Sequence, residues 1–118
     1  KEEGLDILTL VTGCGPAISA YFMNIISSYA ENQGFPQKES INIALKVFEG
    51  TTNYLNENNL SPSKLIESVA TKGGVTEVII NSLNKVGMNN LFEEAMESGY
   101  DKLHQLKAKI RTETEVKK

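Results

Sequence analysis

The sequence has no tryptophan, one cysteine and one histidine among its 118 residues. A single cysteine excludes an intrachain disulfide framework and is typical of a reducing compartment. One histidine and one cysteine cannot supply a closed set of zinc ligands, so we expect no metal site. The net charge is -3, and nucleic-acid binding requires a basic face. We therefore expect no nucleic-acid partner.

The chain also lacks a long uninterrupted apolar run. The longest, Pro16–Ala30, contains Asn24, Ser27 and Ser28, and we consider it too short and too polar to span a bilayer. No signal peptide is visible, so we expect a cytoplasmic protein without a membrane partner. The chain begins with Lys1 and not with methionine, so we expect a fragment, or a processed or trimmed form, of a longer protein.

No stretch alternates apolar and polar residues for long enough to form a strand. Prolines occur only at positions 16, 36 and 62, where helices can begin. Five helices are expected, over residues 16–31, 37–56, 63–70, 75–86 and 89–110, and a short helix over 4–11 would make six. The sequence thus predicts an all-α bundle of five to six helices that forms one domain, residues 1–118.

Helical spacing predicts which side chains face inward. These are Ile41, Leu45, Phe48, Thr52 and Leu55 in the second helix and Val78, Ile79 and Leu83 in the fourth. The helix over residues 16–31 is apolar on several faces, and a small chain can hardly cover it alone. A second copy of the chain could bury the apolar faces of this helix. The spacing of its apolar residues therefore favours a homodimer.

The loop TKGGVT, Thr71–Thr76, joins two expected helices through a glycine pair. Gly73 or Gly74 can adopt the left-handed conformation that ends a helix. The next helix then presents unpaired N–H groups to the loop, and glycines let an anion approach the backbone. With the hydroxyls of Thr71 and Thr76, the loop has donors for a small carboxylate. Plain helix capping is the alternative.

A second glycine-rich segment, TGCGPAI, covers Thr12–Ile18. It lacks the preceding strand and the glycine spacing of a dinucleotide fingerprint, so we reject that interpretation. Cys14 would need a base to act as a nucleophile, and His104 lies far along the chain. We expect Cys14 to be a small packed residue and His104 to be solvated or to cap a helix.

Three longer motifs resemble the C-terminal domain of the pyrroline-5-carboxylate reductase family. DILTLVTGCGPAI is similar to the family's domain-junction motif, with matches at Asp6, Thr9, Gly13, Gly15, Pro16 and Ala17. ENQGFPQKESINIA is similar to its Gly-Leu-Pro turn. SVATKGGVTEVIINSLNKVGMNNLFEEAM is similar to its signature Val-Thr-Ser-Pro-Gly-Gly-x-Thr and the two helices that follow. The resemblance extends over residues 3–106.

The resemblance implies both a fold and an activity. Reductases of this family have an N-terminal Rossmann domain for NADPH or NADH, and a helical domain of the 6-phosphogluconate-dehydrogenase-like type. The helical domain interlocks with that of a second subunit. This implies an interlocking homodimer, or a larger ring of dimers, that reduces 1-pyrroline-5-carboxylate to L-proline. The Rossmann domain is absent from this chain, so the fragment alone is expected to bind no cofactor and to be inactive.

The resemblance also implies roles for the residues of the loop. In the family, the serine and the N–H groups of the loop hold the substrate carboxylate, and the final threonine lies beside the ring nitrogen. By position, Thr71, Gly73, Gly74, Val75 and Thr76 would bind the imino-acid substrate. Thr76 would also be catalytic and relay a proton to the nitrogen.

Three positions depart from the family pattern. Lys72 replaces a proline, Ile79 replaces alanine or glycine, and Ile18 replaces an aromatic residue. These departures keep a second hypothesis open, a helical dimerisation or interaction module of a non-catalytic or differently specific relative. A Gly-x-Gly-x-x-Gly motif upstream would favour the enzyme.

Overall fold

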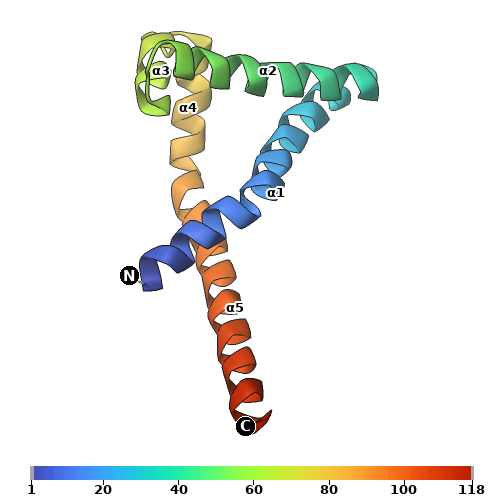
Figure 1. Ribbon diagram of the computed structural model, residues 1–118. Coiled ribbons are helices and arrows are strands. Elements are labelled where there is room, and N and C mark those ends of the chain that lie inside the picture. The colour runs from blue at the N-terminus through green and yellow to red at the C-terminus, as the bar shows by residue number, and fades with distance from the viewer. Residues whose placement is uncertain (1, 118) are drawn as a thin grey trace. The chain divides into compact units, whose positions relative to one another are not determined.

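The structure is a computed structural model that describes residues 2–117 (Figure 1). Its helices are α1 (Glu2–Asn32), α2 (Gln37–Glu57), α3 (Pro62–Val69), α4 (Val75–Lys85) and α5 (Met88–Lys117). The residues in this range form no strand. The prediction of an all-α fold with five helices is confirmed, and α2, α3 and α4 agree with the expected bounds to within one residue.

The prediction for the first helix was wrong at its start. The structure has one continuous helix from Glu2, with Pro16 inside it, where we expected a break before a helix beginning at Pro16. A proline inside a helix removes one backbone hydrogen bond and costs about 3 kcal/mol. Helical residues continue for more than three turns on both sides, and cooperative propagation across them offsets that local cost. The last helix also runs to Lys117, seven residues beyond the expected end at Ile110.

Two of the helices end in Schellman motifs. After α1, Gly34 has φ 109°, its N–H donates to the Glu31 carbonyl at 3.0 Å, and the Phe35 N–H donates to the Ala30 carbonyl at 3.2 Å. After α2, Asn59 takes the same place with φ 50°. Each pair of bonds satisfies carbonyls that a helix end leaves unpaired, which fixes the two turns.

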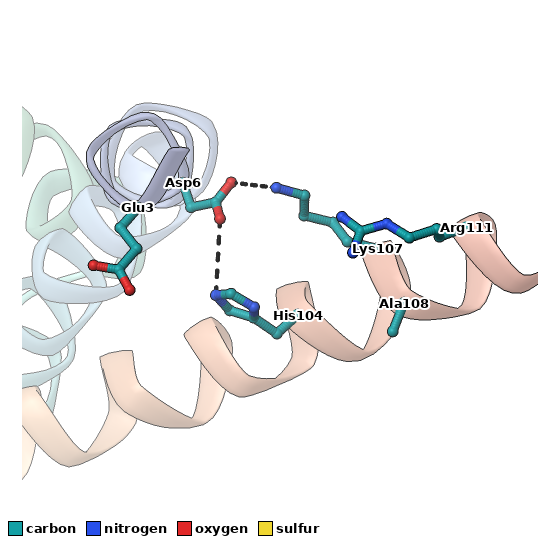
Figure 2. A pocket seen from close by; sticks show the side chains of 6 residues that line it. All are labelled: Glu3, Asp6, His104, Lys107, Ala108 and Arg111. Atoms are coloured by element: carbon teal, nitrogen blue, oxygen red, sulfur yellow. Dashed lines mark hydrogen bonds and ion pairs between the residues drawn. The ribbon is translucent and has the colours of Figure 1, made fainter. Parts of the chain in front are cut away.

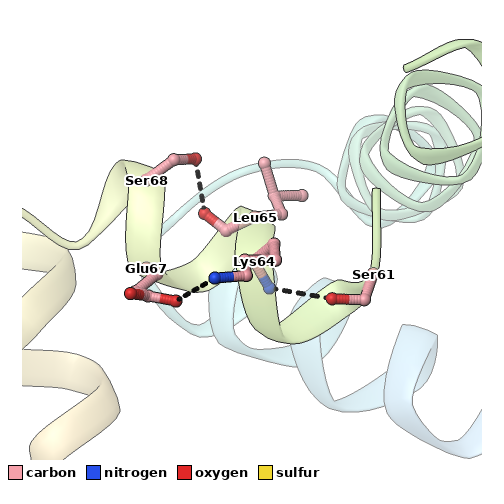
Figure 3. Close-up of polar contacts among 5 residues, drawn as sticks. All are labelled: Ser61, Lys64, Leu65, Glu67 and Ser68. Carbon is pink, nitrogen blue, oxygen red and sulfur yellow. Dashed lines mark hydrogen bonds and ion pairs between the residues drawn. The ribbon is translucent and has the colours of Figure 1, made fainter. Parts of the chain in front are cut away.

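The helix α3 begins with a side-chain cap (Figure 3). Ser61 accepts a hydrogen bond from the Lys64 N–H at 3.1 Å, and Pro62 follows at the first helical position. Both features are typical of a helix start. An exposed pair between Lys64 and Glu67, 3.6 Å apart, lies on the same short helix. This cap fixes the start of α3. The loop Thr71–Thr76 follows the other end of that helix.

The chain divides into two compact units. One comprises the residues up to Gly15 with those from Ser82 onward, and the other comprises Pro16–Asn81. In the first unit, the start of α1 contacts α5. Leu10 is buried, and a Cβ at Gly99 would lie 3.4 Å from its Cδ1 atom. A glycine on α5 therefore allows the two helices to approach closely.

The second unit contains the rest of α1, then α2, α3 and the start of α4. Its buried residues are small: Ser27 of α1, and Ser40 and Ala44 of α2. The last two lie four residues apart on one face of α2. In Figure 1, α3 and the start of α4 lie at the end of α2 that is remote from the α1–α2 turn.

The predicted inward faces are largely exposed in the single chain. Ile41 and Leu45 are 45% and 48% exposed, and Val78 and Ile79 are 62% and 54% exposed. The inward prediction for these residues was therefore wrong for one chain, because the described residues include no element that covers these faces. The helix over residues 16–31 is likewise uncovered, with Tyr29 68% exposed. This confirms that one chain does not bury that helix.

Within α1, the stretch Glu3–Asn32 is 30 residues long and contains an 18-residue window with a mean hydropathy of 1.3, which is enough to cross a membrane by length and composition alone. The sequence argument considered only Pro16–Ala30 and missed this because the helix starts earlier. The core helix of a water-soluble protein can pass the same test. An acidic residue inside the apolar stretch, Asp6, is buried against a lysine of α5, and charged groups in a membrane are costly.

Candidate functional site

The loop between α3 and α4 is a closed turn. The Gly74 N–H donates to the Thr71 carbonyl at 2.9 Å, and Gly73 has φ 78°. A hydrogen bond between the first and fourth residues, with a positive φ at the third, is characteristic of a type II turn. Lys72 occupies the second position of the turn, where proline is common.

Positions 73 and 74 each require a glycine, but for different structural reasons. Gly73 has the left-handed backbone that side chains rarely adopt. Gly74 has no such φ, but a Cβ there would lie 2.8 Å from the Thr71 Oγ1 atom and 3.1 Å from the Thr71 carbonyl oxygen. The close approach of Thr71 is by itself sufficient reason for a glycine at position 74. The left-handed conformation that the sequence allowed at either glycine is found at Gly73.

Three of the N–H groups of the loop already have partners within the chain, and Thr71 donates to the Val69 carbonyl at 3.1 Å. Gly74 donates to Thr71, and Gly73 donates to the Glu77 Oε1 atom at 2.9 Å. The first intrahelical bond at this end runs from Val78 to Gly74, at 3.3 Å. Helix geometry leaves the N–H groups of the first turn, at Val75, Thr76 and Glu77, without an intrahelical acceptor. These are the donors that can face an anion.

All five residues predicted for this site therefore lie together, on the turn and on the first residues of α4. Val75 is 78% exposed, and Thr71 and Thr76 are exposed. The site is open on the surface of the second unit. The sequence argument missed Glu77, although an acidic residue two to three positions into a helix is a known signal of a capping interaction.

A separate polar cluster lies in the first unit (Figure 2). The Asp6 carboxylate, on α1, is 2.7 Å from Lys107 Nζ and 3.7 Å from His104 Nε2, both on α5. These residues, with Glu3, Ala108 and Arg111, line a hollow of about 310 Å³. Asp6 is buried, so Lys107 compensates a charge that is largely removed from water. The cluster ties the start of α1 to α5.

His104 is half exposed, and its ring lies 4.4 Å from the ring of Tyr100. The expectation of a solvated histidine holds only in part, because the side chain also faces Asp6. The pKa of Tyr100 is raised by partial burial and by the carboxylates of Glu3 and Asp6. Nothing in sequence spacing alone could have paired Asp6 with a residue 101 positions away.

Cys14 is exposed, so the expectation that it is packed was wrong for the single chain. Its neighbours Gly13 and Gly15 lie inside α1, and a Cβ at either would meet no atom within 4 Å. Among the residues that the structure describes, no group of three or more His, Cys, Asp or Glu could hold a metal ion.

Comparison with known proteins gives one consistent result. Residues 2–106 match a family model described as "Pyrroline-5-carboxylate reductase dimerisation". The chain is 29% identical to a pyrroline-5-carboxylate reductase of Aquifex aeolicus over 96 residues, 81% of this chain and 36% of the relative. It is 33% identical to pyrroline-5-carboxylate reductase 3 of Bacillus subtilis over 101 residues, 81% of this chain and 37% of the relative.

Solved structures agree. A pyrroline carboxylate reductase of Plasmodium falciparum with NADP bound superposes with a TM-score of 0.78 at 26% identity, covering 86% of this chain and 39% of that one. A reductase of Streptococcus pyogenes has a TM-score of 0.80 at 22% identity, with the same coverage, and supports the fold. The chain thus spans little more than a third of the length of the relatives it matches.

Proposed function

This chain belongs to the pyrroline-5-carboxylate reductase dimerisation family, and from that membership we propose that it is the dimerisation and substrate-carboxylate-binding domain of a reductase. The reaction is the reduction of 1-pyrroline-5-carboxylate to L-proline, the last step of proline biosynthesis. The observation that carries the proposal is the match to the family over residues 2–106. It includes the whole of the turn and the start of α4.

The proposed substrate site is the turn with the first residues of α4. Thr71 and the N–H groups of Val75 and Thr76 hold the substrate carboxylate, where the positive end of the helix dipole favours an anion. Gly73 and Gly74 shape this site, since their own N–H groups bond within the chain. The Thr76 hydroxyl lies beside the ring nitrogen and helps to deliver the proton that the nitrogen takes up.

The hydride would come from NADPH or NADH, as the NADP in the Plasmodium falciparum relative suggests for the cofactor class. The described residues do not fit a dinucleotide site. Gly13 and Gly15 lie within a continuous helix, whereas dinucleotide phosphates require a glycine-rich turn between a strand and a helix. We propose that the cofactor is held outside this chain, in a Rossmann domain, and that the 118 residues alone are inactive.

The proposed partner is a second copy of the chain, interlocked through the exposed apolar faces of α1 and α2. Tyr21, Ile25 and Tyr29 on α1, and Ile41 and Leu45 on α2, are each more than 40% exposed in one chain. Such a large uncovered apolar area marks a protein interface. We place the dimer, or a ring of dimers, in the cytoplasm.

The experiment is an assay of the intact protein for NADPH- or NADH-dependent reduction of 1-pyrroline-5-carboxylate. Thr76→Ala should lower kcat/KM by roughly 10- to 1000-fold, the range for loss of a positioned hydrogen-bond donor. Thr112→Ala, which makes the same change at an exposed threonine of α5, is the control. If the Thr76→Ala variant kept full activity, the loop would serve only to cap a helix and would not bind substrate.

A second candidate function is a dimerisation module without catalysis. The departures at Lys72, Ile79 and Ile18 favour it, together with the exposed apolar faces, which require a partner whether or not the protein is an enzyme. An intact protein that forms dimers in sedimentation but neither binds L-proline nor reduces the imine would support this candidate over the first.

A further inference from the structure

Glu77 places a carboxylate of the chain itself at the proposed substrate site. Its Oε1 atom accepts the Gly73 N–H at 2.9 Å, and Glu77 itself belongs to the first turn of α4, next to Thr76. The side chain is half-buried. A carboxylate at this end of a helix is stabilised by the dipole in the way that a bound anion is. One donor of the turn is therefore occupied before any substrate arrives.

The bond from Gly73 also holds the turn. Gly73 has φ 78°, a conformation that a glycine leaves easily because it has many alternatives. With its N–H bonded to Glu77 and the next N–H bonded to the Thr71 carbonyl at 2.9 Å, the turn is closed by two independent bonds. The Thr71 hydroxyl, which packs over Gly74, is thereby held against the last residue before α4.

We propose that Glu77 is a positioning residue of the substrate loop that also sets its affinity, with two opposed effects on carboxylate binding. As a hydrogen-bond acceptor it keeps the Thr71–Gly74 turn closed and the donors aligned. As a negative charge beside those donors it weakens the binding of any carboxylate, including that of the product. The proposal rests on the assignment of this loop as the carboxylate site.

Two substitutions separate the effects. Glu77→Gln retains an oxygen that can accept the Gly73 N–H but removes the charge, whereas Glu77→Ala removes both. The control is Glu39→Gln, since Glu39 is the acid in the first turn of α2. That helix has 21 residues, about 30 Å in length, and α3 follows at its far end (Figure 1).

The measurement is the dissociation constant of L-proline, and the KM for the imine, with the intact protein at low salt and at about 1 M sodium chloride. Removal of one like charge near an exposed site should tighten proline binding by Glu77→Gln about two- to fivefold at low salt. At 1 M salt the Debye length is about 3 Å, so this gain should largely vanish. Glu77→Ala should bind more weakly than Glu77→Gln at both salt concentrations.

If Glu77 only held the turn in place, Glu77→Gln would not bind proline more tightly at low salt than at high salt. The inference is overturned if Glu77→Gln binds proline no tighter than the wild type or Glu39→Gln, or if its gain persists at high salt. It is also overturned if Glu77→Ala and Glu77→Gln behave alike. A wild-type protein that neither binds proline nor reduces the imine would instead refute the proposed function, and this inference with it.

Discussion

Asp6→Asn tests whether one ion pair holds the start of α1 on α5. The Nζ–Oδ1 distance to Lys107 is 2.7 Å, and the side chains of Asp6 and Lys107 are 10% and 34% exposed. Exposed pairs contribute about 0.2 to 1 kcal/mol, whereas removal of one partner of a fully buried pair costs about 3 to 5 kcal/mol. This pair lies between these limits. We expect Asp6→Asn to lower the free energy of unfolding by about 1 to 3 kcal/mol.

The assay is urea unfolding of the 118-residue chain at fixed protein concentration. Lys107 takes part in further interactions, so the single variants alone would not isolate the pair. The double-mutant cycle of Asp6→Asn with Lys107→Met does so, and methionine retains much of the apolar stem. We expect a coupling energy of about 1 kcal/mol or more. A coupling below about 0.3 kcal/mol, the usual scatter for independent sites, would refute the reasoning.

Three further predictions concern the interface, the turn and the alkaline range. Ile26 is 39% exposed on α1, so Ile26→Asp should dissociate the dimer in sedimentation, because a charge in an apolar interface costs several kcal/mol; a dimer of unchanged affinity would place Ile26 outside the interface. Lys72→Pro should raise the free energy of unfolding by about 0.4 to 1 kcal/mol, since proline suits the second position of a type II turn; a lower urea midpoint would contradict the turn assignment. Because the pKa of Tyr100 is raised above 10.0, the folded state retains its proton longer than the unfolded state, and stability should fall as pH rises from about 10 through the raised pKa. Tyr100→Phe should lessen this fall relative to Tyr54→Phe, and equal curves for the two variants would count against it.

Local sequence signals predicted some parts of the fold well. The bounds of α2, α3 and α4 followed mainly from Pro36, Pro62 and the pair Gly73 and Gly74, because helix starts and turns depend on neighbouring residues. The same logic failed at Pro16. The strength of a proline as a helix breaker depends on the packing and helical context on both sides, which local signals do not contain.

The inward faces and the polar contacts were harder to predict. Periodicity identified the apolar faces of α2 and α4 but could not tell whether this chain or a second one covers them, and in the single chain Ile41 and Val78 are exposed. At the loop, sequence located the turn and its glycines. The partners of their N–H groups, Thr71 and Glu77, depend on backbone geometry that a pattern of residues does not specify.

The ion pair between Asp6 and Lys107 also bears on where this domain can be cut. The family match ends at residue 106, one residue before the lysine that neutralises Asp6. Asp6 itself lies inside the matched region. A chain trimmed to the family limit would keep a buried acid and lose its nearest cation, so expression boundaries drawn from the family alone would yield a less stable domain. The turn of α5 that carries Lys107, which the family match leaves out, therefore belongs to the folding unit.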